Sequence, residues 1–378
     1  MCVVISSRAS YARVRSVLRA IQQEESLELV LLVGASTLLH RFGQAIDVIR
    51  ADGFRVDGTI RMIVEGETPA TMAKSTGLGL LELPTLFEIF MPDIVVTVAD
   101  RFETLATAIA ASYMNIPLAH IQGGEVSGSI DESVRHAVTK LAHLHLSATR
   151  LSAERLIRMG EAPESVFVVG CPSVDTLVDH DLSLDPGLLR PFGGVGPDVD
   201  LERAFLLVLQ HPVTTEYGQG LPQIEETLAA IDTFGMQTIM LWPNVDAGAE
   251  DIAKGIRIWR ERGLLRNVHL YRNLPVEVFN KLLRHCACVI GNSSAGIREG
   301  SFLGTPVVNI GSRQAGRERG PNVVDVGHNR REIVAAIARQ VEHGRFPPVA
   351  IYGDGKAGQR IAEILATWEL RTQKRLIY

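Results

Sequence analysis

Short, continuous apolar runs alternate along this chain with amphipathic stretches of helical period. The runs are apolar at successive positions, which is typical of parallel strands that are covered on both faces. Strand followed by helix, repeated, predicts a doubly wound α/β fold. In the first half we expect strands at residues 2–5, 27–33, 94–98, 118–121, 144–147 and 166–169, and helices at 11–23, 104–114, 132–143 and 152–159.

Residues 181–200 interrupt this pattern with three prolines and four glycines, which predicts a linker or surface loop. A second α/β series follows, and a last helix at 357–370 could cross back to the first domain. We therefore expect two Rossmann-like domains around a cleft, residues 1–180 with the C-terminal helix 357–378, and residues 200–350. The second series has predicted strands at 205–209, 237–241, 268–271, 288–291 and 307–310, and helices at 221–234, 251–261, 275–285, 295–303 and 331–342.

Composition narrows the classes of function. The chain has 378 residues, of which 46% are hydrophobic and 21% charged, as in a globular protein. Lys and Arg number 38 against 43 Asp and Glu, so the formal net charge is −5, and the pI is near 6.1. A nucleic-acid binder usually carries a basic stripe and a higher pI, so we expect no nucleic-acid partner.

The cysteines, the N-terminal residues and the longest uncharged stretch indicate the compartment. No pair among Cys2, Cys171, Cys286 and Cys288 has the C-x-x-C spacing of a zinc or redox site. We expect buried free thiols in a reducing compartment. The first residues lack the basic leader of a signal peptide, and the longest stretch without charged residues, 104–124, is too polar to span a bilayer. We therefore expect a cytoplasmic protein with no membrane partner.

Polar residues directly after the predicted strands are the first candidates for a site, because open α/β sheets bind ligands at the carboxyl ends of their strands. Arg8, behind two serines, could hold an anion at a helix N-terminus or could be a solvated side chain beside an ordinary Ser cap. Asp100 is either a helix cap or a catalytic carboxylate.

The strand at 118–121 is followed by a cluster of polar groups. Gln122 and Glu125 flank two glycines, which would let the backbone approach a ligand closely. Asp131 and Arg135 stand four residues apart, and the plainer interpretation is a capping Asp with a surface salt bridge. Because several polar groups leave adjacent strand ends together, we favour a functional role.

The second half has two such clusters. His211 follows the first strand and could serve as acid, base or phosphate ligand, although a lone His is more often structural. Ser293 and Ser294 begin a helix and suit a diphosphate, and Glu299, about one turn further, could accept both hydroxyls of a ribose. A Walker A motif is missing, and so is G-x-G-x-x-G after the first strand, which argues against NAD.

Together these clusters resemble the hydrolysing UDP-N-acetylglucosamine 2-epimerases of sialic and related nonulosonic acid biosynthesis. The resemblance implies the two-domain glycosyltransferase-B fold with the active site in the interdomain cleft, no metal, no organic cofactor, and a homodimer or homotetramer. The matching segments follow in order along nearly the whole chain: SSRASYARV (6–14), DRFETLA (100–106), HIQGGEVSGSIDESVRHAVTKLAH (120–143), GCPSVD (170–175), QHPVTTEY (210–217), PNVDAG (243–248), GNSSAGIREG (291–300) and GTPVVNIGSRQAGRERGPNV (304–323).

The resemblance also implies a role for each candidate residue. Members such as the animal enzyme have Glu where this chain has Gln122, and a Gln cannot exchange a proton at neutral pH. Proton transfer would then fall to Asp100, Asp131 or Glu125, unless the substrate differs. The implied diphosphate contacts are Arg8, Ser293 and Ser294, the ribose contact is Glu299, the sugar contacts are Asp100, Asp131 and His211 with Arg135 nearby, and further phosphate or closure contacts are Arg313, Gln314 and Arg317.

The reaction implied is the conversion of UDP-N-acetylglucosamine to free N-acetylmannosamine and UDP, by elimination to 2-acetamidoglucal and rehydration. Three alternatives share the fold: a hydrolysing 2-epimerase of UDP-2,4-diacetamido-2,4,6-trideoxyglucose in legionaminic acid synthesis, a GDP-linked version, and a glycosyltransferase. An alternative of another class is a catalytically silent sugar-nucleotide sensor, which Gln122 makes conceivable.

Overall fold

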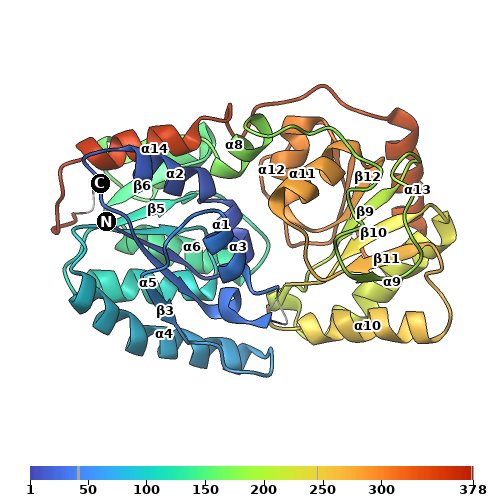
Figure 1. Cartoon of the computed structure of the whole chain (residues 1–378), viewed down its shortest axis with the longest axis horizontal. Helices are drawn as coiled ribbons and strands as arrows, with labels where there is room; N and C mark the ends of the chain where they lie inside the picture. Colours follow the sequence, from blue (N-terminus) through green and yellow to red (C-terminus); the bar gives the residue numbers. More distant parts are fainter. Residues whose placement is uncertain (41–42, 245, 376, 378) are drawn as a thin grey trace. The chain divides into compact units, whose positions relative to one another are not determined.

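The structure is a computed structural model that describes residues 1–40, 43–244, 246–375 and 377. The chain folds as two compact units, each built on a parallel-rich sheet with helices, so the predicted fold class is confirmed (Figure 1). Unit 1 comprises Met1–Glu125, Ile130–Asp179 and Tyr352–Tyr378, and unit 2 comprises Val126–Ser129 and His180–Ile351.

Unit 1 contains sheet A, whose described strands are all parallel and lie in the order β3-β2-β1-β4-β5-β6-β7. The strands are β1 (Cys2–Ile5), β2 (Val30–Gly34), β3 (Gly58–Ile60), β4 (Val95–Val98), β5 (Leu118–Ile121), β6 (Leu144–Ser147) and β7 (Val166–Val168). The helices are α1 (Arg8–Ala12), α2 (Arg15–Gln23), α3 (Ala45–Ala51), α4 (Pro69–Phe90), α5 (Phe102–Tyr113), α6 (Ile130–Leu141), α7 (Arg150–Arg158), α8 (Pro172–Val178) and α14 (Ala357–Thr367), with short 3₁₀ turns η1 (Ala35–Leu38) and η3 (Pro163–Ser165).

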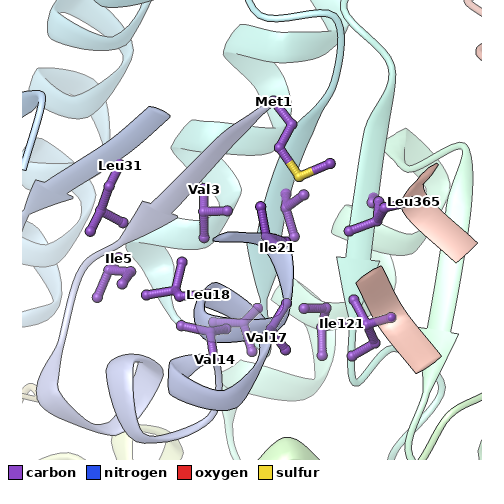
Figure 2. Close-up of a cluster of buried hydrophobic side chains, with 14 of the residues drawn as sticks. Met1, Val3, Ile5, Val14, Val17, Leu18, Ile21, Leu31, Ile121 and Leu365 are labelled. Atoms are coloured by element: carbon purple, nitrogen blue, oxygen red, sulfur yellow. The ribbon is translucent and has the colours of Figure 1, made fainter. Parts of the chain in front are cut away.

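Both faces of sheet A are buried, which explains the continuous apolar runs of its strands. Successive side chains of β1 point to opposite faces: Val3 and Ile5 pack with α2 and α14, whereas Cys2 and Val4 pack with α4 and α5. Figure 2 shows Leu365 of α14 in the same apolar cluster as the side chains of β1 and α2. Figure 1 shows α2 and α14 on one side of the sheet and α4 and α5 on the other.

Asp175 of α8 fastens the C-terminal helix to unit 1. One carboxylate oxygen accepts the backbone N–H of Ala357 at 3.0 Å, and the other accepts that of Gly358 at 2.7 Å and the Ser16 hydroxyl at 2.8 Å. These N–H groups belong to the first turn of α14 and would otherwise lack a partner. The acid of the GCPSVD segment is therefore a helix cap supplied from a distant element.

Helices α3, α4 and α8 are not among the expected elements, and one expected helix of unit 1 is divided. The expected helix at 11–23 is two helices, because the capping box of Ser7 and Ser10 starts α1 at Arg8 and the backbone leaves the helical range at Val14. The long helix α4 is absent from the expected elements because Gly77, Gly79 and Pro84 are signals of a break. A Cβ at Gly79 would lie only 3.0 Å from the Cβ of Ala106 in α5, so this glycine serves close helix packing.

Unit 2 contains sheet B in the order β14-β13-β12-β9-β10-β11-β8. The expected linker is not wholly irregular, because β8 pairs antiparallel with β11 at the edge, while the other described strands run parallel. The strands are β8 (Gly194–Val195), β9 (Leu206–Leu209), β10 (Thr238–Leu241), β11 (Val268–Tyr271), β12 (Cys288–Gly291), β13 (Val307–Ile310) and β14 (Val323–Val326). The helices are α9 (Gly220–Phe234), α10 (Ala249–Glu261), α11 (Val276–His285), α12 (Ser294–Leu303) and α13 (Arg330–His343), with the 3₁₀ turn η4 (Thr214–Glu216).

The structure also shows the state of the cysteines and the character of the helices. All four cysteines are buried and unpaired, which confirms the prediction of free thiols. Among the helices of the described ranges, none has both the length and the apolar character that a membrane crossing requires.

Candidate active site

The candidate residues lie at the topological switch point of each sheet. In sheet A the strand order reverses between β1 and β4, and in sheet B between β9 and β12. Open α/β sheets bind ligands at such points because the loops that leave the two adjacent strands diverge. Arg8 and Asp100 follow β1 and β4, whereas His211 and Ser293 follow β9 and β12.

Asp100 and Arg135 form a buried ion pair in unit 1. Nε of Arg135 donates to Oδ2 of Asp100 at 3.1 Å, and Nη2 donates to the same oxygen. Nη1 donates to the backbone carbonyl of Glu125 at 2.7 Å. The Arg135 side chain is only 1% exposed. This arginine of α6 therefore joins the ends of β4 and β5, a wider role than the salt bridge expected from its spacing to Asp131.

The charges around Arg135 favour the ionised pair. Burial alone would lower the pKa of Arg135, but the negative charges of Asp100 and Glu125 outweigh burial, and the pKa lies above its ordinary value. Asp131, in the first turn of α6, adds to the same effect. Buried groups with perturbed pKa values cluster at functional sites, so this arrangement marks a candidate site.

The backbone next to these acids is strained. Ala99 and Gln122, directly after β4 and β5, have φ of +65° and +69°, a region that residues with a side chain seldom adopt. His120 donates from Nε2 to the Ala99 carbonyl at 2.7 Å, and burial lowers the pKa of His120 to about 4, so the ring is neutral at pH 7. Such strain is typical of functional sites, and here it sets the direction in which Asp100 leaves its strand.

Gln122 is held by a residue that we did not single out from the sequence. Its Nε2 donates to Sγ of Cys171 at 2.9 Å, and Sγ lies 2.9 Å from the Ser173 hydroxyl. Gln122 is fully buried, and its Oε1 has no hydrogen-bond partner within the described part of the chain. The GCPSVD segment, which matches the family, was the signal that could have drawn attention to Cys171.

The two glycines after Gln122 serve packing. A Cβ on Gly124, whose φ is +75°, would lie 2.2 Å from the carbonyl oxygen of Ser152 in α7, and one on Gly123 would lie 3.0 Å from Nδ1 of His120. Both glycines therefore have a packing reason, and the expectation that they let the backbone approach a ligand stays a prediction.

Arg8 presents a positive charge without a carboxylate. Ser7 caps α1 by accepting the N–H of Ser10 at 3.1 Å, but α1 has only five residues and contributes little dipole. In the described residues Arg8 has no ion pair, and burial lowers the pKa of Arg8 to about 10. The guanidinium itself is therefore the group suited to an anion.

In unit 2, α12 begins directly after β12. Ser293 is the N-cap, and its hydroxyl accepts the N–H of Ala295 at 3.4 Å. Ser294 is the first helical residue, and Glu299 lies in the second turn of the same helix. The first N–H groups and the dipole of a ten-residue helix favour an anion such as a phosphate.

Two side chains of the loop after β13 donate hydrogen bonds to Asn292, the residue that precedes Ser293. Nη1 of Arg313 and Nε2 of Gln314 donate to the carbonyl of Asn292 at 3.2 and 2.9 Å. Arg313 also lies 3.7 Å from a carboxylate oxygen of Asp246. Arg317, in the same loop, is buried. Asn292 and Asp246 were missed as single residues, although both lie in segments that match the family.

His211 is oriented through its ring. The backbone N–H of Asn244 donates to Nδ1 of His211 at 3.2 Å. Nδ1 is therefore the unprotonated nitrogen, and neutral His211 carries its proton on Nε2. The expected roles of His211 were acid, base or phosphate ligand, and a neutral ring with this tautomer could bind a phosphate as a hydrogen-bond donor through Nε2. In the described part of the chain, no group of three or more His, Cys, Asp or Glu side chains is placed to hold a metal ion.

The fold consists of two Rossmann-like units, as in the glycosyltransferase-B fold. The chain belongs to the UDP-N-acetylglucosamine 2-epimerase family, whose model matches residues 19–366. The resemblance seen in the motifs is thereby confirmed.

Three known proteins illustrate the similarity. The chain is 35% identical to the UDP-N,N'-diacetylbacillosamine 2-epimerase (hydrolyzing) of Legionella pneumophila, over 98% of this chain and 96% of that protein. It is 28% identical to the UDP-N-acetylglucosamine 2-epimerase of Neisseria meningitidis, over 100% and 98%. A crystal structure of UDP-GlcNAc 2-epimerase from Neisseria meningitidis bound to UDP-GlcNAc superposes with a TM-score of 0.79 at 19% identity, covering 96% of this chain and 98% of that chain, a likeness of fold.

Proposed function

We propose that this chain is a hydrolysing 2-epimerase that converts a UDP-linked 2-acetamido sugar to UDP and a free sugar of mannose configuration. The observation that carries the proposal is the buried Asp100–Arg135 pair at the switch point of sheet A. Arginine keeps the carboxylate ionised and fixes its position, which are the two properties required of a general base.

Each unit, taken by itself, offers groups that are suited to one part of the substrate. The guanidinium groups of Arg8 and Arg313 and the start of α12 at Ser293 and Ser294 are suited to the diphosphate. Glu299 is suited to the ribose, because a carboxylate accepts hydrogen bonds from two neighbouring hydroxyls. Gln314 and Arg317 are proposed to support the diphosphate-binding loop from within.

The first step is an elimination. Asp100 takes the proton from C2 of the sugar while the bond between C1 and the UDP oxygen breaks and its electron pair leaves with UDP. The product is a 2-acetamidoglucal. Donors to the departing diphosphate stabilise the charge that develops on it, and one well-placed donor typically contributes about 2.7–4 kcal/mol. Nε2–H of His211 is proposed as one of these donors.

The second step is a hydration. Water adds its oxygen to C1, and a proton returns to C2 from the face opposite to the one it left. Opposite faces require a second proton-handling group, because one fixed carboxylate serves one face. We assign this role to Asp131 or Glu125, since the amide of Gln122 cannot exchange a proton at neutral pH.

Two substrates are candidates. The 35% identity to a relative named for UDP-N,N'-diacetylbacillosamine, against 28% to one named for UDP-N-acetylglucosamine, favours a 2,4-diacetamido-2,4,6-trideoxy sugar. UDP-N-acetylglucosamine is the second candidate, because the family model that matches nearly the whole chain carries its name.

NMR of the reaction in D₂O tests both the reaction and the substrate. With each UDP-sugar supplied separately and no acceptor present, we expect UDP and a free mannose-configured sugar with one deuterium at C2, and faster turnover of the diacetamido substrate. A stable UDP-linked epimer, or a released sugar with its original C2 hydrogen and configuration, would contradict hydrolysing epimerisation. Binding of both UDP-sugars without release of UDP would indicate a sensor instead.

We also propose that two copies of the chain associate through α4. The outer face of this helix carries exposed apolar side chains among its charged ones, which is unusual unless that face is covered. Leu81 and Ile89 are 74% and 62% exposed, and Met91 follows the helix. Lys74 and Glu88 lie on the face of Leu81, seven residues before and after it. An antiparallel pair with its two-fold axis at Leu81 therefore places each Lys74 opposite the partner's Glu88.

Light scattering after gel filtration tests this interface. We expect Leu81→Glu to give a monomer, while Val195→Glu, at another exposed apolar position on the edge strand β8 of unit 2, keeps the native mass. Lys74→Glu should weaken the dimer, and Lys74→Glu with Glu88→Lys should restore it. A native mass for Leu81→Glu would show that α4 is not the interface.

A further inference from the structure

Asn292 links β9 and β12, the two strands at the switch point of sheet B. It lies just beyond the last residues that pair in their register. The β12–β9 register ends at Gly291 and Leu209. One residue further, Oδ1 of Asn292 accepts the backbone N–H of His211 at 2.8 Å, and Nδ2 donates to the His211 carbonyl at 2.8 Å. The amide thus satisfies both backbone groups of His211, as a neighbouring strand would.

Gly291 lets the Asn292 side chain reach this position. Its φ is +125°, and a Cβ there would lie 2.2 Å from the Leu209 carbonyl oxygen. The chain turns at this glycine while the N–H of Asn292 still donates to Leu209 at 3.0 Å. Asn292 is fully buried, so the two bonds to His211 do not compete with water.

The backbone of Asn292 reaches the third loop of the same site. Its carbonyl accepts hydrogen bonds from Arg313 and Gln314, which follow β13. One asparagine therefore connects the loops after β9, β12 and β13, and these loops carry His211, Ser293 and Arg313. Within the described residues, none of the groups that bond to Asn292 belongs to α12, the helix that follows it.

We propose that Asn292 is a positioning residue that sets the place and direction of the His211 Nε2–H donor. The inference rests on the proposed function for its catalytic consequence, but the placement of the ring concerns His211 alone. With its backbone held by Asn292 and Nδ1 held by Asn244, His211 has one orientation and one tautomer. Loss of the amide frees the backbone of His211 and disturbs the ring contact to Asn244.

Asn292→Asp is the variant that tests this role. It keeps the volume and the acceptor for the His211 N–H, but it places a carboxylate oxygen against the His211 carbonyl. We expect kcat to fall by about 100-fold, since a displacement of about 1 Å can cost that much. We expect the KM for the UDP-sugar to change by less than about threefold, because misplacement affects the departing diphosphate more than ground-state binding.

The ring of His211 provides a second readout that does not depend on turnover. In long-range ¹H–¹⁵N spectra, wild-type His211 is expected to show the Nε2–H tautomer, and Asn292→Asp is expected to shift or broaden that signal. His211→Gln identifies the signal by its loss. If no UDP-sugar is turned over, the proposed function fails, whereas this spectrum still decides whether Asn292 positions His211.

Asn322→Asp is the matched control. Asn322 is also a buried asparagine of unit 2, and its Nδ2 donates to the Thr305 carbonyl at 2.8 Å, away from His211. We expect a similar loss of stability with native kcat and a native His211 signal. A native kcat and His211 signal in Asn292→Asp, or an equal loss of kcat in Asn322→Asp, would overturn the proposal. If Asn292→Asp does not fold, Asn292→Ser is measured against the same two criteria.

Discussion

Asp100→Asn is expected to reduce turnover of the UDP-sugar by about 10²–10⁴-fold, the range that one proton-transfer group typically contributes. The amide keeps the size of the side chain and an oxygen that can accept from Arg135, but it cannot take the C2 proton. We expect the variant to fold and to bind UDP, which is measured by calorimetry alongside single-turnover kinetics.

Two comparison variants sharpen this result. Asp131→Asn is expected to show a loss of the same order if Asp131 handles the second proton, and solvent deuterium should then no longer reach C2 at the normal rate. Gln122→Glu is expected to change turnover far less, because the native residue is not a base. Near-native rates in both Asn variants would show that the bases are assigned wrongly.

Arg135→Met is expected to destabilise unit 1 by about 3–5 kcal/mol, the usual cost of leaving one partner of a buried ion pair uncompensated. The Asp100 carboxylate would lose two hydrogen-bond donors, and the Glu125 carbonyl would lose the donor Nη1 of Arg135. Urea unfolding followed by circular dichroism measures the change. Activity should fall as well, because Asp100 would no longer be held in place.

The double variant separates charge from packing. Arg135→Met with Asp100→Asn removes both charges, so we expect much of the stability to return while activity stays lost. Arg15→Met is the matched control, since Arg15 pairs with Asp52 in the same unit at 2.9 Å, outside the candidate site. It is expected to unfold more easily and to keep its turnover per folded molecule. Recovery of activity in the double variant would mean that Asp100 is not the base.

Local patterns in the sequence were sufficient for most of the strands. Strands β1, β5, β6, β11, β12 and β13 lie at the predicted residues, because a buried parallel strand needs an apolar side chain at each position and polar residues mark its ends. Arg8, Asp100 and His211 could be selected as site candidates in the same way, because each follows closely after a strand. The helix at 69–90 was missed because its glycines and proline contradict helix propensity, and packing of Gly79 on Ala106 overrides that propensity.

By itself, the sequence determined the α/β class, the family and the residue types available for chemistry, because these depend on neighbours along the chain. Which residues meet was decided by the tertiary structure alone. Arg135 reaches Asp100 across 35 positions and Asn292 reaches His211 across 81. Such pairings depend on strand order and on backbone turns at Gln122 and Gly291, and neither leaves a periodic trace in the sequence.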